Sequence, residues 1–122
     1  MWEVFGTDEF DEWFGPLGDD AHADILAKVN LLRQRGPKLG RPHADTLNGS
    51  KYANMKELRA NTAEQVFRIA FAFDPKRRAI LLIGGDKHGV SQKKFYKQLI
   101  AKADRLYAAH LAEIDAQKES GE

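Results

Sequence analysis

The stretch that decides the fold runs from Met55 to Ile83 and reads MKELRANTAEQVFRIAFAFDPKRRAILLI. Apolar and polar residues alternate through much of it, which predicts antiparallel strands joined by short turns. We expect strands over 55–59, 66–73 and 79–83, with turns at 60–64 and 74–78. The last strand is so uniformly apolar that it should be buried on both faces, and the following Gly84-Gly85 should end it.

Helical patterns flank this meander on both sides. On its N-terminal side we expect a short strand over 2–5, a helix capped by Thr7 or Asp8, and a second helix from Asp19 or Asp20 to about residue 34. Residues 38–52 are rich in Gly, Pro, Asn and Ser and should form a loop. On the C-terminal side, apolar residues recur every three or four positions after Ser91, which predicts a helix.

The predicted architecture is therefore α+β, with a single domain over residues 1–122. An N-terminal strand and a helical hairpin pack on a small, mainly antiparallel sheet, and a C-terminal helix follows. The length allows one hydrophobic core but not two ordinary domains. The tail from about Asp115 is polar, and we expect it to fray.

Composition excludes several kinds of chemistry. The chain has no cysteine, which rules out disulfides, thiolate metal ligands and cysteine nucleophiles. Its four histidines lack the spacing of a metal site, so we expect no metal and no cofactor. The N-terminal segment is acidic where a signal peptide would be basic, and no stretch is long and apolar enough to span a membrane. We expect a cytoplasmic protein without membrane contact.

Charge is segregated along the chain although the formal net charge is only +1. Residues 33–102 carry sixteen of the nineteen Lys and Arg against five acidic residues, and both ends are acidic. A basic middle region is typical of a surface that binds a polyanion, although a solvated surface with chance clustering gives the same pattern.

Strand alternation places two arginines on one face of the sheet. If Leu58 and the phenylalanines of 66–73 point into the core, then Met55, Glu57, Arg59 and Arg68 point to the opposite face. Two guanidiniums on an open face would bind successive phosphates. Alternatively, Glu57 forms an ordinary ion pair with Arg59 or Arg68.

The segment after the third of these strands adds candidates for proton transfer. Lys87 and His88 lie in a loop at the margin of the same sheet, and imidazole titrates near neutral pH. Tyr96 lies on the first turn of the last helix, where its hydroxyl could reach the sheet face. Each also has a simpler interpretation: His88 as a surface residue, and Tyr96 as an aromatic anchor of the helix.

Five short motifs resemble the RelE/HigB toxin superfamily, in particular its HigB-type branch with phage-derived members. The motifs, in order, are LNGSKY (47–52), MKELR (55–59), FRIAF (67–71), ILLI (80–83) and GDKH (85–88). Their order and spacing carry the resemblance, which covers about residues 1–107.

This resemblance implies a toxin of a type II toxin–antitoxin system that cleaves mRNA on the ribosome without a metal, and so inhibits translation. It implies that Arg59 and Arg68 hold the scissile phosphate, and that Lys87, His88 and Tyr96 serve proton transfer. It also implies an antitoxin partner with a helix-turn-helix, through which alone the complex would contact operator DNA. The neighbouring basic residues Lys51, Lys56, Lys93 and Lys94 are candidates for RNA binding.

The chain departs from the family pattern on the first strand of the meander. Familiar members carry lysines where this chain has Met55 and Glu57, and Lys56 is predicted to face the other way. The general base is therefore open: Lys51 from the loop or Glu57 itself could serve. Two other functions also remain open, a ParE-like gyrase inhibitor and a non-catalytic RNA-binding or regulatory module on the same fold.

Overall fold

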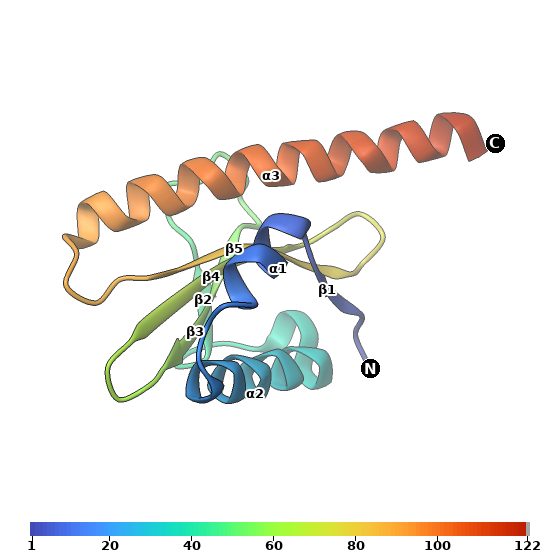
Figure 1. Cartoon of the computed structure of the whole chain (residues 1–122). Coiled ribbons are helices and arrows are strands. Elements are labelled where there is room, and N and C mark those ends of the chain that lie inside the picture. The colour runs from blue at the N-terminus through green and yellow to red at the C-terminus, as the bar shows by residue number, and fades with distance from the viewer. Residues whose placement is uncertain (122) are drawn as a thin grey trace.

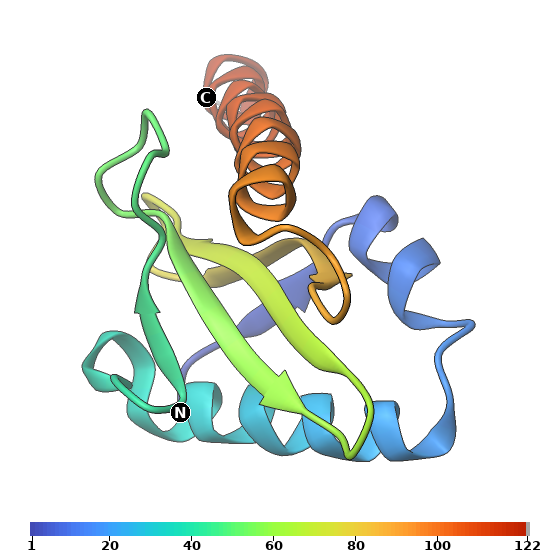
Figure 2. The same ribbon diagram turned by 90° about the vertical axis from the view of Figure 1, so that its left-hand side faces the viewer.

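The computed structural model describes residues 1–121, which form three layers. Figures 1 and 2 show the sheet in the middle, with α2 on one side and α3 on the other. The elements are β1 (Val4–Gly6), α1 (Asp8–Phe14), α2 (Asp19–Arg35), the 3-10 turn η1 (Gly36–Lys38), β2 (Ala44–Thr46), β3 (Lys56–Asn61), β4 (Val66–Phe73), β5 (Ala79–Asp86) and α3 (Gln92–Gly121). The strand order is β1-β5-β4-β3-β2, with β1 parallel to β5 and the other pairs antiparallel. The α+β architecture predicted from the sequence is confirmed.

One face of the sheet packs on the two N-terminal helices. The alternate β4 residues Phe67, Ile69 and Phe71 are fully buried there, together with Leu58 of β3. Helix α2 supplies its predicted apolar stripe to the same cluster, including Ile25. Thr7 caps α1 as expected by accepting the Phe10 N–H at 2.9 Å, whereas the N-cap residue of α2 is Gly18 and not an aspartate.

The opposite face is not open, which corrects the prediction. Helix α3 crosses it and buries a second apolar cluster, which contains Ala70, Ala72, Ile80 and Leu82 from the sheet and Met55 just before β3. An amphipathic helix as long as α3 needs a partner for its apolar stripe, and this face provides it. Charged side chains lie on this face beside the first turns of α3, where Glu57, Arg59 and Arg68 are close to Tyr96. Met55 therefore belongs to the core, which explains why no lysine stands there.

The sequence predicted that Gly84 and Gly85 end the strand, but β5 continues through both glycines to Asp86. The ring of Trp13 from α1 packs against Gly84, and the ring of Phe95 from α3 packs against Gly85. A Cβ at either position would collide with the aromatic ring. The two glycines thus serve close packing on both faces of the sheet and are not strand breakers.

Strand β2 was missed by the sequence analysis, which predicted a loop over residues 38–52. The strand has three residues and pairs only with β3, where Ala44 lies opposite Leu58 and Thr46 opposite Lys56. Such a short edge strand has no hydrophobic alternation to reveal it. At the other end of the chain, α3 remains helical to Gly121, beyond Asp115 where we expected fraying, and residue 122 lies outside the described residues.

A buried ion cluster closes the end of the sheet where β4 turns into β5. The Asp74 carboxylate accepts hydrogen bonds from His110 at 2.9 Å and from the Arg78 guanidinium at 3.0 Å, and its other oxygen accepts the Arg78 N–H. Burial alone would raise the pKa of Asp74, but these hydrogen bonds and the Arg78 charge lower it below the usual value. A carboxyl with a lowered pKa stabilises the fold above its unfolded pKa of about 4, and the contribution disappears as the pH falls through the folded pKa.

We therefore expect Asp74→Asn to lower the free energy of unfolding by about 2 kcal/mol at neutral pH, because hydrogen bonds to a charged group are lost. Urea unfolding at neutral pH and at about pH 3 tests this, since the gap between wild type and variant should shrink below about pH 4. A gap of the same size at both pH values would show that the carboxylate charge is not what stabilises this turn.

Candidate functional site

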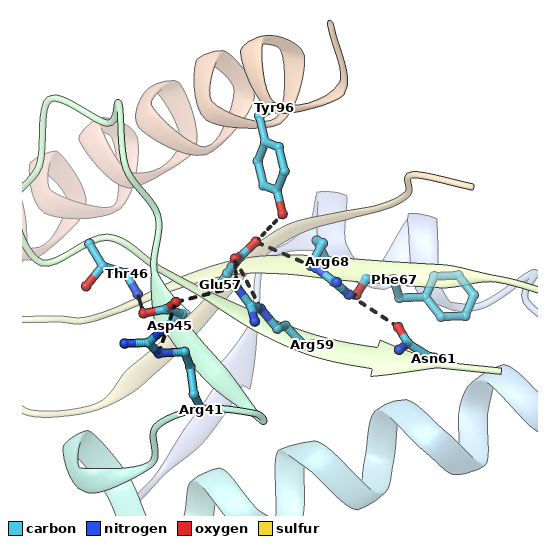
Figure 3. A network of polar contacts seen from close by, with 9 residues as sticks. All are labelled: Arg41, Asp45, Thr46, Glu57, Arg59, Asn61, Phe67, Arg68 and Tyr96. Carbon is cyan, nitrogen blue, oxygen red and sulfur yellow. Dashed lines mark hydrogen bonds and ion pairs between the residues drawn. The ribbon is translucent and has the colours of Figure 1, made fainter. Parts of the chain in front are cut away.

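The candidate site lies on the α3 side of β3 and β4, where Tyr96 from the start of α3 reaches the Glu57 side chain on the sheet (Figure 3). Arg59 of β3 and Arg68 of β4 are directly opposite each other in the antiparallel register. Alternation had predicted that they share a face, and the structure confirms this. The adjacent strands thus hold two guanidiniums side by side on a rigid scaffold.

Glu57 joins the two arginines and the helix. Its side chain is buried, with the residue 4% exposed. One carboxylate oxygen accepts hydrogen bonds from Arg59 at 3.0 and 3.3 Å, and the other accepts the Tyr96 hydroxyl at 2.7 Å. Arg68 Nε lies 3.9 Å from that second oxygen. Both sequence interpretations therefore hold at once: the arginines share a face, and Glu57 pairs with them.

Arg68 is 9% exposed, which contradicts the prediction of an exposed sheet position. Its NH1 donates to the Phe67 carbonyl at 2.8 Å and to the Asn61 side chain at 3.3 Å. Its Nε is buried and makes no hydrogen bond within residues 1–121. The Glu57 carboxylate, 3.9 Å from this Nε, offsets the charge of the buried guanidinium.

Arg59 also bonds outward, to the edge strand β2. Its NH2 lies 3.4 Å from Asp45, and Asp45 in turn pairs with Arg41 at 3.6 Å. The sequence analysis missed Asp45, Arg41 and Asn61. Asp45 could have been found only by recognising β2, because the register of β2 is what places it opposite Glu57.

The structure places the two neighbouring candidates for proton transfer, Lys87 and His88, in different surroundings. The Lys87 ammonium lies over the Tyr96 ring, 5.6 Å from its centroid. Burial and the nearby charge of Arg68 lower the pKa of Lys87. His88 follows in the same turn but is exposed, and in residues 1–121 its imidazole makes no hydrogen bond. The structure therefore places Lys87, and not His88, against Tyr96 of the site.

Tyr96 reaches the sheet face, as the sequence suggested. Burial raises the pKa of its phenol, and so does the hydrogen bond to the Glu57 carboxylate. The phenol is thus protonated at neutral pH and acts as a donor that orients Glu57.

We expect Tyr96→Phe to lower the free energy of unfolding by about 2 kcal/mol, because one hydrogen bond to the charged, buried Glu57 is lost. Urea unfolding at neutral pH measures the effect. A variant as stable as the wild type would show that this hydrogen bond contributes nothing net to the fold.

The four predicted RNA-binding lysines are not equivalent. Lys93 lines a hollow of about 610 Å³ together with Glu57, Arg59 and Tyr96. Lys94 is exposed at the start of α3, and Lys56 lies at the register position opposite Phe71, on the α2 side of β3. Lys51 belongs to a loop whose backbone is held by Asp104, about two helical turns beyond Tyr96. Only Lys93 of the four lines the hollow beside the site.

The hollow and its charges define what the site can bind. Three arginines of the network stand against the carboxylates of Glu57 and Asp45, and Lys87 and Lys93 add positive charge. This arrangement suits a polyanion that offers several phosphates. Within residues 1–121, no cluster of three or more His, Asp or Glu side chains is placed to hold a metal ion. In the same part of the chain no helix has the length and apolar character to cross a membrane.

Comparison with known proteins assigns the class. Residues 12–108 match the family described as phage-derived protein Gp49-like (DUF891). The match covers most of the chain and includes the whole meander with the first turns of α3. The chain belongs to this family.

Two relatives from Mycobacterium tuberculosis (strain ATCC 25618 / H37Rv) carry toxin names. The protein named "Putative toxin HigB3" is 47% identical over 97 residues, which are 80% of this chain and 82% of the relative. The protein named "Putative toxin HigB2" is 39% identical over 107 residues, which are 87% of this chain but 53% of the relative. The chain thus spans about half the length of HigB2. These findings confirm the resemblance to HigB-type, phage-derived members.

Proposed function

We propose that the chain is the toxin of a toxin–antitoxin pair and a metal-independent endoribonuclease that cleaves mRNA on the ribosome. The observation that carries the proposal is the pair Arg59 and Arg68 on adjacent strands, both within ion-pair distance of the single carboxylate of Glu57. The toxin names of the relatives support it.

The same groups suit cleavage by the ribose 2′-hydroxyl. Arg59 and Arg68 bind the non-bridging oxygens of the scissile phosphate and stabilise the charge that grows in the transition state. Glu57 accepts the 2′-hydroxyl proton as the 2′-oxygen attacks phosphorus. The bond from phosphorus to the 5′-oxygen breaks, and Lys87 donates a proton to that oxygen. The products are a 2′,3′-cyclic phosphate and a 5′-hydroxyl end.

The assignment of acid and base follows from the surroundings of each group. Lys87 is a better acid than an ordinary lysine because its pKa is lowered. Glu57 is held by Tyr96 on one oxygen and by Arg59 on the other, so Arg59 must transfer to the phosphate before Glu57 can accept a proton. His88, in the same turn as Lys87, is the second candidate for the acid.

The proposed partner is an antitoxin, with a helix-turn-helix, that covers the basic site and neutralises the toxin. Contact with operator DNA would occur only through this antitoxin. Toxin and antitoxin would meet in the cytoplasm, where the ribosomes are.

One observation favours a second function. Both Glu57 oxygens are occupied, and the pairing of Glu57 with both arginines would suit a module that binds RNA without cutting it. Such a module would bind the same polyanion but would leave it intact.

Expression in growing cells tests the proposal, with Arg59→Ala as the inactive control and mapping of 5′-hydroxyl ends of mRNA as the measurement. We expect growth arrest with new ends inside coding regions. We also expect the adjacent reading frame to encode a helix-turn-helix protein whose co-expression relieves the arrest. Arrest with DNA breaks and no new mRNA ends would indicate gyrase inhibition, and the absence of arrest would favour the non-catalytic module.

A further inference from the structure

A second hollow lies on the other side of Arg59. It has a volume of about 420 Å³ and is lined by Lys28 of α2, by Pro42, and by Arg59 and Arg68 of the sheet, among others. Arg59 lines both this hollow and the larger one beside Tyr96. Strand β2 begins at Ala44, opposite Leu58, and the lining of the hollow extends from Arg59 and Arg68 of the sheet to Lys28 of α2.

Lys28 is held in this hollow by a neutral partner. Its ammonium lies 2.7 Å from His43 Nδ1. Since an ammonium only donates, Nδ1 accepts and the ring proton is on Nε2. Burial lowers the pKa of His43, and the charges of Lys28 and Arg35 lower it further, so the ring stays neutral at physiological pH.

The positive charge of Lys28 is not compensated by an acid. No carboxylate within residues 1–121 lies at ion-pair distance from its ammonium, although Asp24 lines the same hollow. The ammonium has three donors, and His43 takes one of them. Lys28 is therefore an oriented cation with donors left for an external anion.

The backbone fixes this cation relative to the candidate catalytic arginine. The Arg59 N–H donates to the His43 carbonyl at 2.8 Å. His43, which holds Lys28, is thus hydrogen-bonded to Arg59, which would hold the scissile phosphate. His43 therefore links the Lys28 ammonium to the backbone of Arg59.

We propose that the hollow between α2 and β3 is a second RNA subsite, in which Lys28 binds a phosphate that flanks the scissile one. This inference rests on the proposed function. A strand laid over Arg59 has a hollow on each side, and the volume of this one falls within the roughly 300–1,000 Å³ of sites that take small ligands. Lys28 is a positioning residue: it places the strand and takes no part in bond breaking.

The test compares Lys28→Ala, Lys28→Arg and the matched control Lys76→Ala in a purified translation system. Lys76 is an exposed lysine in the turn after β4, at the opposite end of that strand from Arg68. We expect Lys28→Ala to raise KM about tenfold with little change in kcat, because one charge-assisted contact to bound RNA is lost. Lys28→Arg should restore most of the affinity, and Lys76→Ala should match the wild type.

Each other outcome overturns the inference. If the wild type cleaves mRNA and Lys28→Ala has the KM of Lys76→Ala, the subsite is wrong while the proposed function stands. A loss that Lys28→Arg does not restore, together with a lowered melting temperature, would give Lys28 a structural role only. If the wild type itself cuts no mRNA, the proposed function fails and the subsite fails with it.

Discussion

Replacing Arg59 with alanine should lower the rate of mRNA cleavage about 10²–10³-fold, the usual loss when one stabiliser of transition-state charge is removed. The free energy of unfolding should also fall by about 2 kcal/mol, because the buried Glu57 carboxylate loses both hydrogen bonds from Arg59, so cleavage is assayed at a temperature where the variant remains folded. Arg59 is the group best placed to receive the scissile phosphate, since it lines both hollows of the site. Initial rates on a defined mRNA in a purified translation system measure the effect.

Arg41→Ala is the matched control for Arg59. It removes the same charge from the same network, but at its outer end, where the Arg41 side chain is 76% exposed and bonds only Asp45 among the described residues. We expect its rate to fall less than about fivefold, because an exposed ion pair contributes at most about 1 kcal/mol. Equal losses in the two variants would mean that general positive charge, and not the position of Arg59, promotes cleavage.

Arg68→Ala should lower the rate of mRNA cleavage by a similar factor. It should also lower the free energy of unfolding by about 2 kcal/mol, since hydrogen bonds from a charged, buried group are lost. The guanidinium bonds the Phe67 carbonyl and Asn61, and it lies beside the buried Glu57. Urea unfolding measures the stability, and cleavage is assayed at a temperature where the variant remains folded. Arg68→Lys keeps the positive charge but loses the planar hydrogen-bonding geometry of the guanidinium. It therefore shows which of the two the site needs.

Two results would contradict this account of Arg68. An Arg68→Ala protein as stable as the wild type would show that the buried hydrogen bonds contribute nothing net. A folded Arg68→Ala protein that still cuts mRNA at the wild-type rate would remove Arg68 from the site.

The sequence predicted the elements whose patterns are periodic. Alternation in β4 located its phenylalanine core and, with the same logic, placed Arg59 and Arg68 on the other face. Such predictions succeed because side chains in a strand point alternately to its two faces, whatever surrounds the strand. The apolar stripe of α2 and the Thr7 cap are local signals of the same kind.

The sequence failed where the environment comes from distant parts of the chain. Gly84-Gly85 looked like a strand end because the rings of Trp13 and Phe95 that cover the two residues come from helices far away in sequence. Arg68 looked exposed because alternation gives the face of a side chain but not what covers that face. The cover on that side is α3, whose long apolar stripe was visible but whose docking position was not.

In the candidate site, too, some residues could be predicted from the sequence and others could not. Glu57, Arg59, Arg68, Lys87 and Tyr96 were named from their positions, and the structure brings them together. Asp45 was missed because it depends on the register of a three-residue edge strand, and Lys28 because it reaches the edge of β3 from another layer. Contacts between layers have no periodic signal in the sequence.

In the proposed function, this site breaks RNA by attack of the ribose 2′-hydroxyl. The most direct measurement first maps the cut in one mRNA in a purified translation system and then repeats the reaction with a single 2′-deoxynucleotide on the 5′ side of that cut. We expect a 5′-hydroxyl end in the first reaction and no cleavage at the substituted position in the second. Cleavage that persists at the 2′-deoxy position, or an mRNA that stays intact in both reactions, would contradict it.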